Sequence, residues 1–235
     1  MKRKNIALIG KGNWGKIIKN KLAKITNIKF VAGKNYKEKN YNDIDWVFIL
    51  TPDYSHKKII DFLFKKKINI FCEKPLVRSY LRSKEIYNKA DSRKQKIYIS
   101  DILNYIKIKK KPKKENIIFR QKKGEYNTKE ILYRLAYHDF YLNYKYLNFS
   151  KTRIVKIFKN KKLKINIINN KYSFNFIYNL KNSKKIHTYN SKQIVKKEDP
   201  LLKMLYTILY KKVNYKENRK VSMFALKFIE KIINN

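Results

Sequence analysis

The residues with the clearest chemical meaning form a glycine-rich turn near the start of the chain. Its glycines follow the apolar run 5–9 in the pattern Gly-x-Gly-x-x-Gly, and an amphipathic segment comes next. In a strand–turn–helix unit these glycines permit the turn, let the backbone approach a pyrophosphate, and let helix and strand pack closely. The helix dipole also favours phosphate at the helix start. An ordinary glycine-rich loop is the alternative to a dinucleotide-binding turn made of Gly10, Gly12, Asn13, Trp14 and Gly15.

Two further polar stretches follow apolar runs that are typical of buried strands. The first is Thr51-Pro52-x-x-x-His56, which follows the run 45–50; the second is Glu73-Lys74-Pro75, which follows the run 68–72. In open α/β sheets, ligands bind at the carboxyl ends of the strands. We therefore expect both stretches to share one sheet edge with the glycine turn.

Strand and helix patterns alternate over the first hundred residues. Continuous apolar runs suit strands that are covered on both faces, and the alternation predicts a parallel, doubly wound sheet. The expected strands cover 5–9, 28–32, 45–50, 68–72 and 96–100, and the expected helices cover 16–24, 57–66 and 79–90. We predict an α/β fold that begins with a Rossmann-type dinucleotide-binding domain over residues 1–105.

The chain changes character at the lysine-rich run 107–114. Such a run can be a nuclear-import or nucleic-acid patch, but a solvated loop at a domain boundary is the favoured interpretation. Beyond it, the patterns predict a strand at 116–121, a helix at 130–147, three or four antiparallel strands within 152–189, and helices at 201–210 and 221–233. Residues 106–235 are thus expected to form a smaller α+β domain with a mainly antiparallel sheet.

The composition raises the question of a nucleic-acid partner. The 235 residues carry a formal net charge of +42, but the lysines are spread along the whole chain, and lysine far outnumbers arginine, the better group for bidentate contacts. Residues with AT-rich codons are abundant together, while Gly (5) and Pro (4) are scarce. Base composition therefore explains the charge better than a nucleic-acid or membrane-surface function, and no specific nucleic-acid partner is expected. The charge would still steer anionic substrates inward at low salt.

The cysteine content and the lengths of the apolar stretches bear on the cellular compartment. Cys72 is the only cysteine, which fits a reducing cytosol. No stretch approaches the ~18–20 apolar residues of a membrane span, and the first apolar run is too short for a signal peptide. We expect a cytoplasmic protein without a membrane span and without a metal site.

The end of the second expected strand bears on the choice of cofactor. An acidic residue there would bind the adenosine ribose hydroxyls, but Gly33-Lys34-Asn35 occupies the place. Lys34 could instead meet a 2′-phosphate, which favours NADP, although a solvated lysine is equally compatible. Both NAD and NADP stay open.

Taken together, the three motifs resemble those of the Gfo/Idh/MocA oxidoreductases, the family of glucose–fructose oxidoreductase and inositol dehydrogenase. The likeness is specific over residues 4–105 and fainter to the C-terminus. It implies an NAD(P)-dependent oxidoreductase that transfers a hydride between the nicotinamide and a hydroxyl or ketone carbon of a sugar, sugar nucleotide or cyclitol. It also implies a homo-oligomer, such as a dimer, built through the C-terminal sheet.

The resemblance implies roles for the second and third motifs. Lys74 would lie beside the nicotinamide and the reacting hydroxyl, where its ammonium can stabilise an alkoxide or shuttle its proton. Glu73 would orient Lys74, and Thr51 and Pro52 would shape the wall beside the cofactor. His56 is expected to be a structural residue of this cofactor-binding loop more than a catalyst. A surface lysine is the alternative for Lys74.

The second catalytic element implied by the resemblance is Asp-x-x-x-His. His138 fits the histidine, but Arg134 stands where the aspartate would be. Arginine would repel a protonated histidine and attract an anionic substrate, so Arg134 and the following Asp139 are substrate-binding candidates. Asp101 is a further substrate-binding candidate and could supply the missing carboxylate. A packed core histidine at 138, or a family member that binds a cofactor or anion without catalysis, are the alternatives, and His187 is expected to be a surface strand residue.

Overall fold

The computed structural model describes residues 2–106, 112–147, 152–194 and 198–234. It divides into two compact units, called the first unit (residues 1–105 and 199–223) and the second unit (residues 106–198 and 224–235). Residues 199–223 thus group with the first unit, whereas the sequence patterns assign them to the second domain. Residues 107–111 of the lysine-rich run lie outside the described residues.

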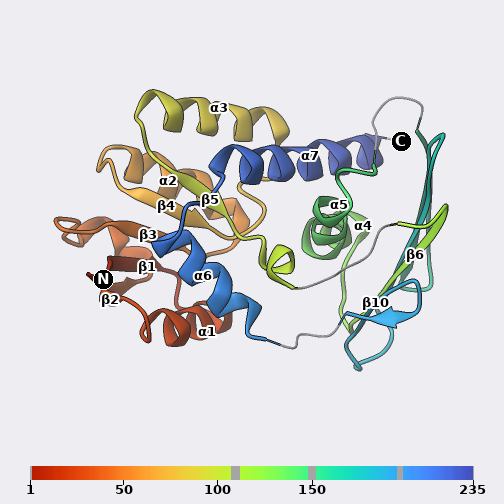
Figure 1. Ribbon diagram of the computed structural model, residues 1–235, viewed down its shortest axis with the longest axis horizontal. Helices are drawn as coiled ribbons and strands as arrows, with labels where there is room; N and C mark the ends of the chain where they lie inside the picture. The colour runs from red at the N-terminus through yellow and green to blue at the C-terminus, as the bar shows by residue number, and fades with distance from the viewer. Residues whose placement is uncertain (1, 107–111, 148–151, 195–197, 235) are drawn as a thin grey trace. The chain divides into compact units, whose positions relative to one another are not determined.

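The first unit contains a five-stranded, fully parallel sheet (Figure 1). Its order is β2-β1-β3-β4-β5, so the direction of winding reverses between β1 and β3, the place where open α/β sheets bind ligands. This confirms the predicted Rossmann-type sheet. The strands are β1 (Asn5–Ile9), β2 (Asn27–Ala32), β3 (Trp46–Ile49), β4 (Asn69–Cys72) and β5 (Ile97–Ile99).

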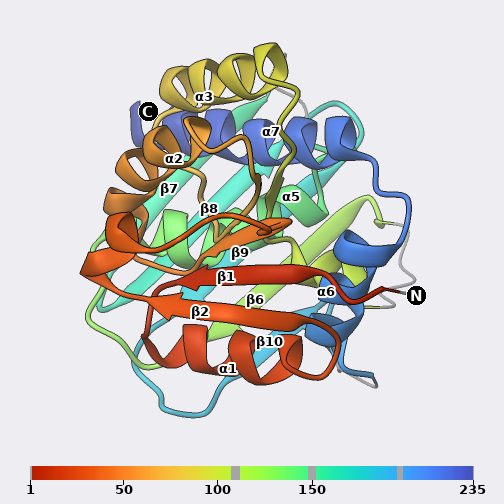
Figure 2. The ribbon, with the colours of Figure 1, turned by 90° about the vertical axis from the view of Figure 1, so that its left-hand side faces the viewer.

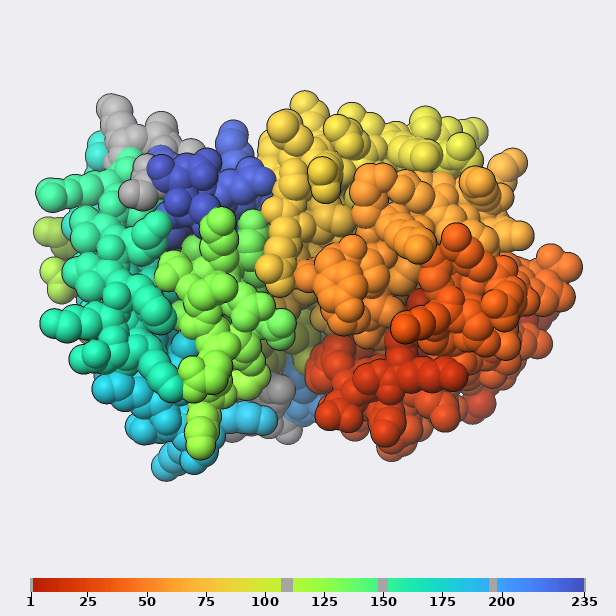
Figure 3. Space-filling view, turned by 180° about the vertical axis from the view of Figure 1, so that it is seen from behind, coloured from red at the N-terminus to blue at the C-terminus, as the bar shows by residue number. Residues whose placement is uncertain are grey.

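Alternating side chains of the strands supply two apolar layers. In β1, Ala7 and Ile9 belong to the layer under α2 (His56–Phe64) and α3 (Tyr80–Ser92). Ile6 and Leu8 belong to the opposite layer, under α1 and α6, whose bounds are Asn13–Leu22 and Pro200–Tyr210. Figure 2 shows β1 and β2 side by side with α1 on one side and α2 and α3 on the other, and α2 and α3 also adjoin one another in Figure 3. The two buried layers fix the positions at which the strands end.

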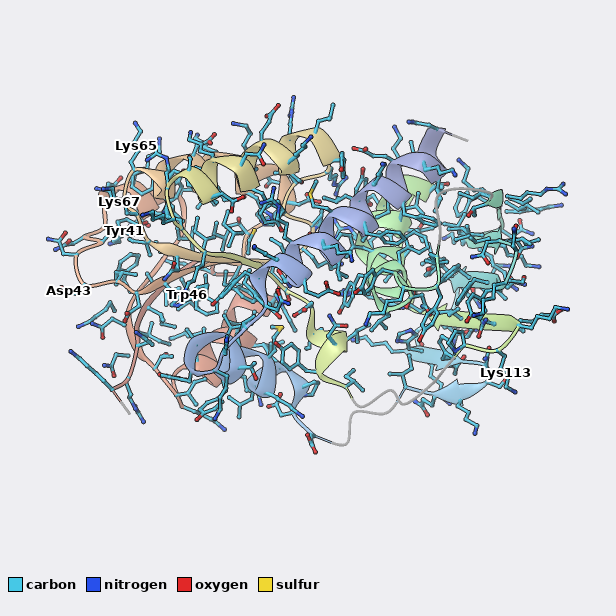
Figure 4. The ribbon with its side chains drawn as sticks, turned by 45° about the horizontal axis from the view of Figure 1, so that its top comes forward. Tyr41, Asp43, Trp46, Lys65, Lys67 and Lys113 are labelled. Carbon is cyan, nitrogen blue, oxygen red and sulfur yellow. The ribbon has the colours of Figure 1, made fainter. Side chains whose placement is uncertain are left out.

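The amino-terminal edge of this sheet is marked in Figure 4 by Tyr41, Asp43, Trp46, Lys65 and Lys67. Asp43 and Lys67 adopt left-handed backbone angles (φ 59° and 55°) in the turns that lead into β3 and β4. The connection from β2 to β3 contains a short 3₁₀ segment, η1 (Lys34–Glu38), in place of a crossover helix. The motifs lie at the opposite edge, called the carboxyl edge below.

The second unit is built on a six-stranded sheet of order β11-β10-β6-β9-β8-β7. All its pairs are antiparallel except β6 with β9, which are parallel. This confirms the mainly antiparallel sheet. Its strands are β6 (Glu115–Gln121), β7 (Arg153–Lys159), β8 (Lys162–Ile168), β9 (Ser173–Asn179), β10 (Ile186–Tyr189) and β11 (Lys192–Gln193).

One face of that sheet is covered by helices of the same unit. Phe140 on α5 packs edge-to-face against Phe176 of β9 and against Phe228 of α7 (Tyr215–Asn234). The single helix expected at 130–147 is instead three short segments: α4 (Thr128–Ile131), a π-helical stretch η4 (Leu132–Ala136) and α5 (Tyr137–Leu142). Among the described residues, no helix combines the length and apolarity needed to span a membrane.

Candidate functional site

The glycine turn packs directly against the end of β3. Gly10 donates its N–H to Ala32 O at 2.9 Å and adopts φ +129°, a conformation that side chains disfavour. A Cβ at Gly10 would lie 2.6 Å from Leu50 O, and a Cβ at Gly15 would lie 2.5 Å from Gly10 O. Both positions therefore require glycine for close backbone packing.

Gly12 differs from the other two glycines because the space around it is open. A Cβ there would meet no described atom within 4 Å. Gly12 is the N-cap of α1, and neither a side-chain cap nor an acidic residue occupies the first turn of that helix within the described chain. The first N–H groups of α1 have no partner inside the helix, and the helix dipole favours anions there. The turn thus fits a pyrophosphate at this position.

The third motif meets the glycine turn through Glu73. Its N–H donates to Ile49 O at 3.0 Å, which continues the pairing of β4 with β3. Its carboxylate accepts a hydrogen bond from Trp14 Nε1 at 2.7 Å. Lys74 follows directly, is half-buried, and is joined to Pro75 by a cis peptide bond. The structure therefore places Lys74 at the carboxyl edge, next in sequence to a residue that contacts the first turn of α1.

His56 connects the second motif to the third. The residue is 1% exposed; its Nε2 lies 2.9 Å from Thr51 O, and its Nδ1 lies 3.0 Å from Pro75 O. Nδ1 is also 3.1 Å from Leu76 O. Both ring nitrogens thus face main-chain carbonyls of the loops that follow β3 and β4, and the ring holds these loops together.

A second contact braces the same pair of loops. Arg78 Nε donates to Asp53 Oδ2 at 2.6 Å, and Ser55 Oγ donates to Thr51 Oγ1 at 2.7 Å. Side chains within ten residues of each motif therefore fix the loops that contain Thr51 and Lys74. Because these contacts are close in sequence to the motifs, the motifs alone are enough to predict the two loops.

Asp101 follows β5 in the first unit and is engaged by neutral donors. Its carboxyl accepts hydrogen bonds from Tyr98 Oη at 2.6 Å, Asn104 Nδ2 at 3.0 Å and Asn218 Nδ2 at 3.2 Å. Burial raises the pKa of Asp101, and these hydrogen bonds only partly counter that effect. Asn218 also bonds both main-chain groups of Ile99. Asp101 thus helps anchor the start of α7 to β5.

His138 and Arg134 belong to the second unit. His138 lies in α5, with its ring 5.7 Å from that of Tyr141 in a tilted, edge-on arrangement. Arg134 lies in η4, is 53% exposed at its side chain, and contacts Glu130 Oε1 at 3.4 Å. Its guanidinium also stands over the Tyr126 ring, 5.3 Å from the centroid. Exposure leaves Arg134 able to meet solutes from solvent.

Asp139 is the centre of a buried ionic cluster. Its carboxylate is 1% exposed and lies 2.8 Å from Arg120 Nε and 3.0 Å from His187 Nε2. Tyr178 Oη donates to it at 3.2 Å, and Arg120 Nη2 donates at 2.9 Å. Burial alone would raise the pKa of Asp139, but Arg120 and His187 outweigh it and lower that pKa. Burial and the neighbouring carboxylate raise the pKa of Tyr178.

Comparison with protein families identifies the fold of the first unit. Residues 19–100 match the profile of the GFO_IDH_MocA oxidoreductase family, which is described by an NAD-binding Rossmann fold. Over these residues the chain is similar to the Gfo/Idh/MocA oxidoreductases. The matched residues contain the second and third motifs and begin after the glycine turn. No curated protein matches the sequence.

Solved structures of several dehydrogenases share the fold over nearly the whole chain. UDP-N-acetylglucosamine 3-dehydrogenase GnnA from Acidithiobacillus ferrooxidans has a TM-score of 0.80 at 14% identity, covering 100% of this chain and 98% of that one. A myo-inositol dehydrogenase from Corynebacterium glutamicum has a TM-score of 0.74 at 12% identity, with coverages of 99% and 96%. The WlbA (WbpB) dehydrogenase from Thermus thermophilus, solved with NAD and UDP-GlcNAcA, has a TM-score of 0.71 at 10% identity, with coverages of 96% and 94%.

The cluster around Asp139 is not among the features expected from the sequence. His187 lies in a strand, β10, as expected, but it is not a surface residue, because its side chain is 18% exposed and its Nε2 lies 3.0 Å from Asp139 Oδ1. Arg120 gave one usable signal, because the alternation along β6 puts it on the same face as the buried Ile118. Pairing with Asp139, 19 residues away, depends on tertiary structure. Within the described ranges, no three His, Cys, Asp or Glu side chains group as a metal site.

Proposed function

We propose that the chain is an NAD(P)-dependent oxidoreductase that transfers a hydride between the nicotinamide and a hydroxyl or ketone carbon of a sugar, sugar nucleotide or cyclitol. The observation that carries the proposal is the joining of three motifs at one sheet edge. Open space at Gly12 is consistent with a pyrophosphate, and the Trp14–Glu73 hydrogen bond of 2.7 Å ties the Lys74 loop to that turn. The family match supports the same class of reaction.

The proposed substrate class rests on the substrates named for proteins of similar fold. One relative by structure is a UDP-N-acetylglucosamine 3-dehydrogenase, another a myo-inositol dehydrogenase, and a third binds UDP-GlcNAcA. All three names point to polyhydroxylated rings with secondary alcohols. The surplus of positive charge on this chain favours the anionic sugar nucleotides among them.

Lys74 is the residue proposed to manage the proton. The nicotinamide, when bound, supplies the hydride acceptor or donor. During oxidation of an alcohol, the Lys74 amine would take the hydroxyl proton while the carbon gives up a hydride, that is, the C–H hydrogen with its electron pair; during reduction, the carbon would gain that hydride and the ammonium would return the proton to the oxygen. In both directions its positive charge stabilises the alkoxide. Thr51, Pro52 and Glu73 would bind beside the cofactor, and Glu73 would hold the Lys74 loop in place.

His138 stays a candidate second catalytic group on the strength of the sequence motif. Since Arg134 replaces the expected aspartate and pairs with Glu130 at 3.4 Å, the proposed role of Arg134 is to attract an anionic substrate. Asp101 and Asp139 stay weaker substrate-binding candidates, because their carboxyl groups already bind several side chains.

The test combines cofactor binding with turnover. NADH and NADPH fluorescence should change on titration with the protein, and hydride transfer should be measurable with UDP-sugars or inositol as substrates. Lys74→Ala should abolish turnover and keep cofactor binding, whereas Lys84→Ala, on the exposed face of α3, should change neither. Lys74→Arg separates charge from proton transfer, because a guanidinium keeps its proton. Failure to bind either cofactor at millimolar concentration would refute the proposal.

A catalytically impaired member of the family is the second candidate. The observation that favours it is Arg134, which is 53% exposed and stands in the place of the motif aspartate. This alternative predicts cofactor or anion binding without turnover on any sugar nucleotide or polyol. Measured hydride transfer would exclude it.

We also propose a homo-oligomer that uses the uncovered face of the second unit's sheet. Cross-strand register puts exposed apolar side chains on that face, among them Ile117 (49% exposed), Ile157 (55%) and Ile168 (47%). Analytical ultracentrifugation should show a dimer or larger species that Ile157→Lys weakens and Leu81→Lys, on α3, leaves intact.

The proposed cytoplasmic location rests on Cys72, which is buried and not bonded to another cysteine.

A further inference from the structure

The end of β2 lies beside the glycine turn, and a lysine from that turn covers it. A Cβ at Gly33 would lie 3.8 Å from Lys11 Cδ and 3.9 Å from Lys11 Cε. The Lys11 side chain thus passes over Gly33, and its ammonium is one bond further on. Lys34 comes directly after Gly33 and is exposed. Two amines therefore flank the first residues after β2.

The same place lacks the group that NAD-dependent sites use. In Rossmann folds a carboxylate at the end of this strand binds the 2′-hydroxyl of the adenosine ribose, while a basic residue accommodates a 2′-phosphate. Residues 33–37 contain no acidic side chain, and the first one after β2 is Glu38, at the far end of η1. Asn35 is occupied locally, since its Oδ1 accepts a hydrogen bond from Gly33 N at 3.3 Å.

We propose that Lys11 and Lys34 bind the 2′-phosphate of NADP(H), which makes this chain prefer NADP(H) over NAD(H). The inference rests on the proposed function, because it needs the dinucleotide to lie with its pyrophosphate at Gly12. Lys11 is the more informative residue: it belongs to the pyrophosphate turn and reaches the ribose end of the site. A hydrogen bond to a charged group corresponds to about 10- to 100-fold in affinity.

The experiment measures binding, independent of turnover. NADPH and NADH are titrated by fluorescence, and 2′,5′-ADP and 5′-ADP by calorimetry, at roughly 150 mM salt to suppress non-specific attraction to the cationic chain. Wild type should bind NADPH and 2′,5′-ADP about tenfold or more tightly than their unphosphorylated counterparts. Lys11→Ala and Lys34→Ala should each weaken the 2′-phosphorylated ligands alone, and the double variant should erase the preference.

Lys29→Ala is the matched control, because it removes the same charge from an exposed position of β2 before the strand's end. It should leave both affinities unchanged. Equal or tighter binding of NADH by wild type would overturn the proposal, as would variants that weaken both cofactors equally. If NADH binds and NADPH does not, only the inference fails; if neither binds, the proposed function fails with it.

Discussion

The two units each enclose an aspartate that the sequence suggested for substrate binding, and they treat it in opposite ways. In the first unit, Asp101 accepts hydrogen bonds from Tyr98, Asn104 and Asn218, which are all neutral. In the second unit, Asp139 meets Arg120 and His187. Burial raises the pKa of Asp101, whereas cationic partners outweigh burial and lower the pKa of Asp139.

The difference shows what each unit relies on. Neutral hydrogen-bond donors do not fully offset the desolvation penalty of a buried carboxylate, whereas a buried arginine can offset it. The arginine then depends on the carboxylate in turn, because removing either partner leaves a buried charge unpaired. The first unit positions its other candidate residues mainly through backbone contacts, such as those of Gly10, Gly15 and His56. The second unit depends on charge at Asp139. Matched substitutions in the two units can test this contrast.

The largest effect is expected from Asp139→Asn. The substitution leaves the Arg120 charge buried without its anion, which typically costs about 3–5 kcal/mol of stability. Urea denaturation followed by circular dichroism measures this loss. Arg120→Met together with Asp139→Asn should recover much of it, because the double variant buries no isolated charge. A single variant within about 0.5 kcal/mol of wild type would show that the cluster does not stabilise the second unit.

A smaller loss is expected when backbone packing in the first unit is disturbed. Gly15→Ala would put a Cβ 2.5 Å from Gly10 O, and overpacking of this kind costs about 1–3 kcal/mol. Gly12→Ala is the control, because its Cβ would meet no described atom within 4 Å. It should leave the melting temperature nearly unchanged and weaken cofactor binding. Equal loss of stability in both variants would contradict the packing described for the turn.

The acid limb of the stability curve separates the units further. Because the folded pKa of Asp139 lies below its unfolded value, the native state binds fewer protons, and this carboxylate stabilises the fold above about pH 4. That contribution is lost as pH falls through the lowered pKa. Unfolding free energies measured from about pH 7 to about pH 3 should therefore show that the cost of Asp139→Asn shrinks toward acid. A cost that stays constant with pH would contradict the lowered pKa.

These contrasts also explain what the sequence could predict. Apolar runs and local spacing predict the strands of the first unit, their parallel arrangement and the glycine turn, and the structure confirms the parallel sheet. The contacts of His56 join residues within about twenty positions of one another. The Asp139 cluster instead draws on β6, α5, β9 and β10, so only the tertiary fold brings Arg120, Tyr178 and His187 together. Likewise, the return of 199–223 to the first unit has no local signal.

The smallest effect is expected from Asp101→Asn, the same substitution in the first unit. The new amide oxygen can accept from Asn104 and Asn218, and its NH₂ can donate to Tyr98 Oη, whose own hydrogen can turn to Tyr105 Oη 3.0 Å away. No buried cation loses a partner, so the cost should be about 1 kcal/mol or less.

The pH dependence of this cost gives a second comparison with Asp139. Since the folded pKa of Asp101 is raised, the wild-type carboxyl stabilises the fold below its unfolded pKa, and that contribution is lost as pH rises through the folded pKa. The cost of Asp101→Asn should therefore decrease from acid to neutral pH, opposite to that of Asp139→Asn, and urea titrations of both variants at matched pH values measure the two slopes. Slopes of the same sign would contradict the opposite pKa shifts of Asp101 and Asp139.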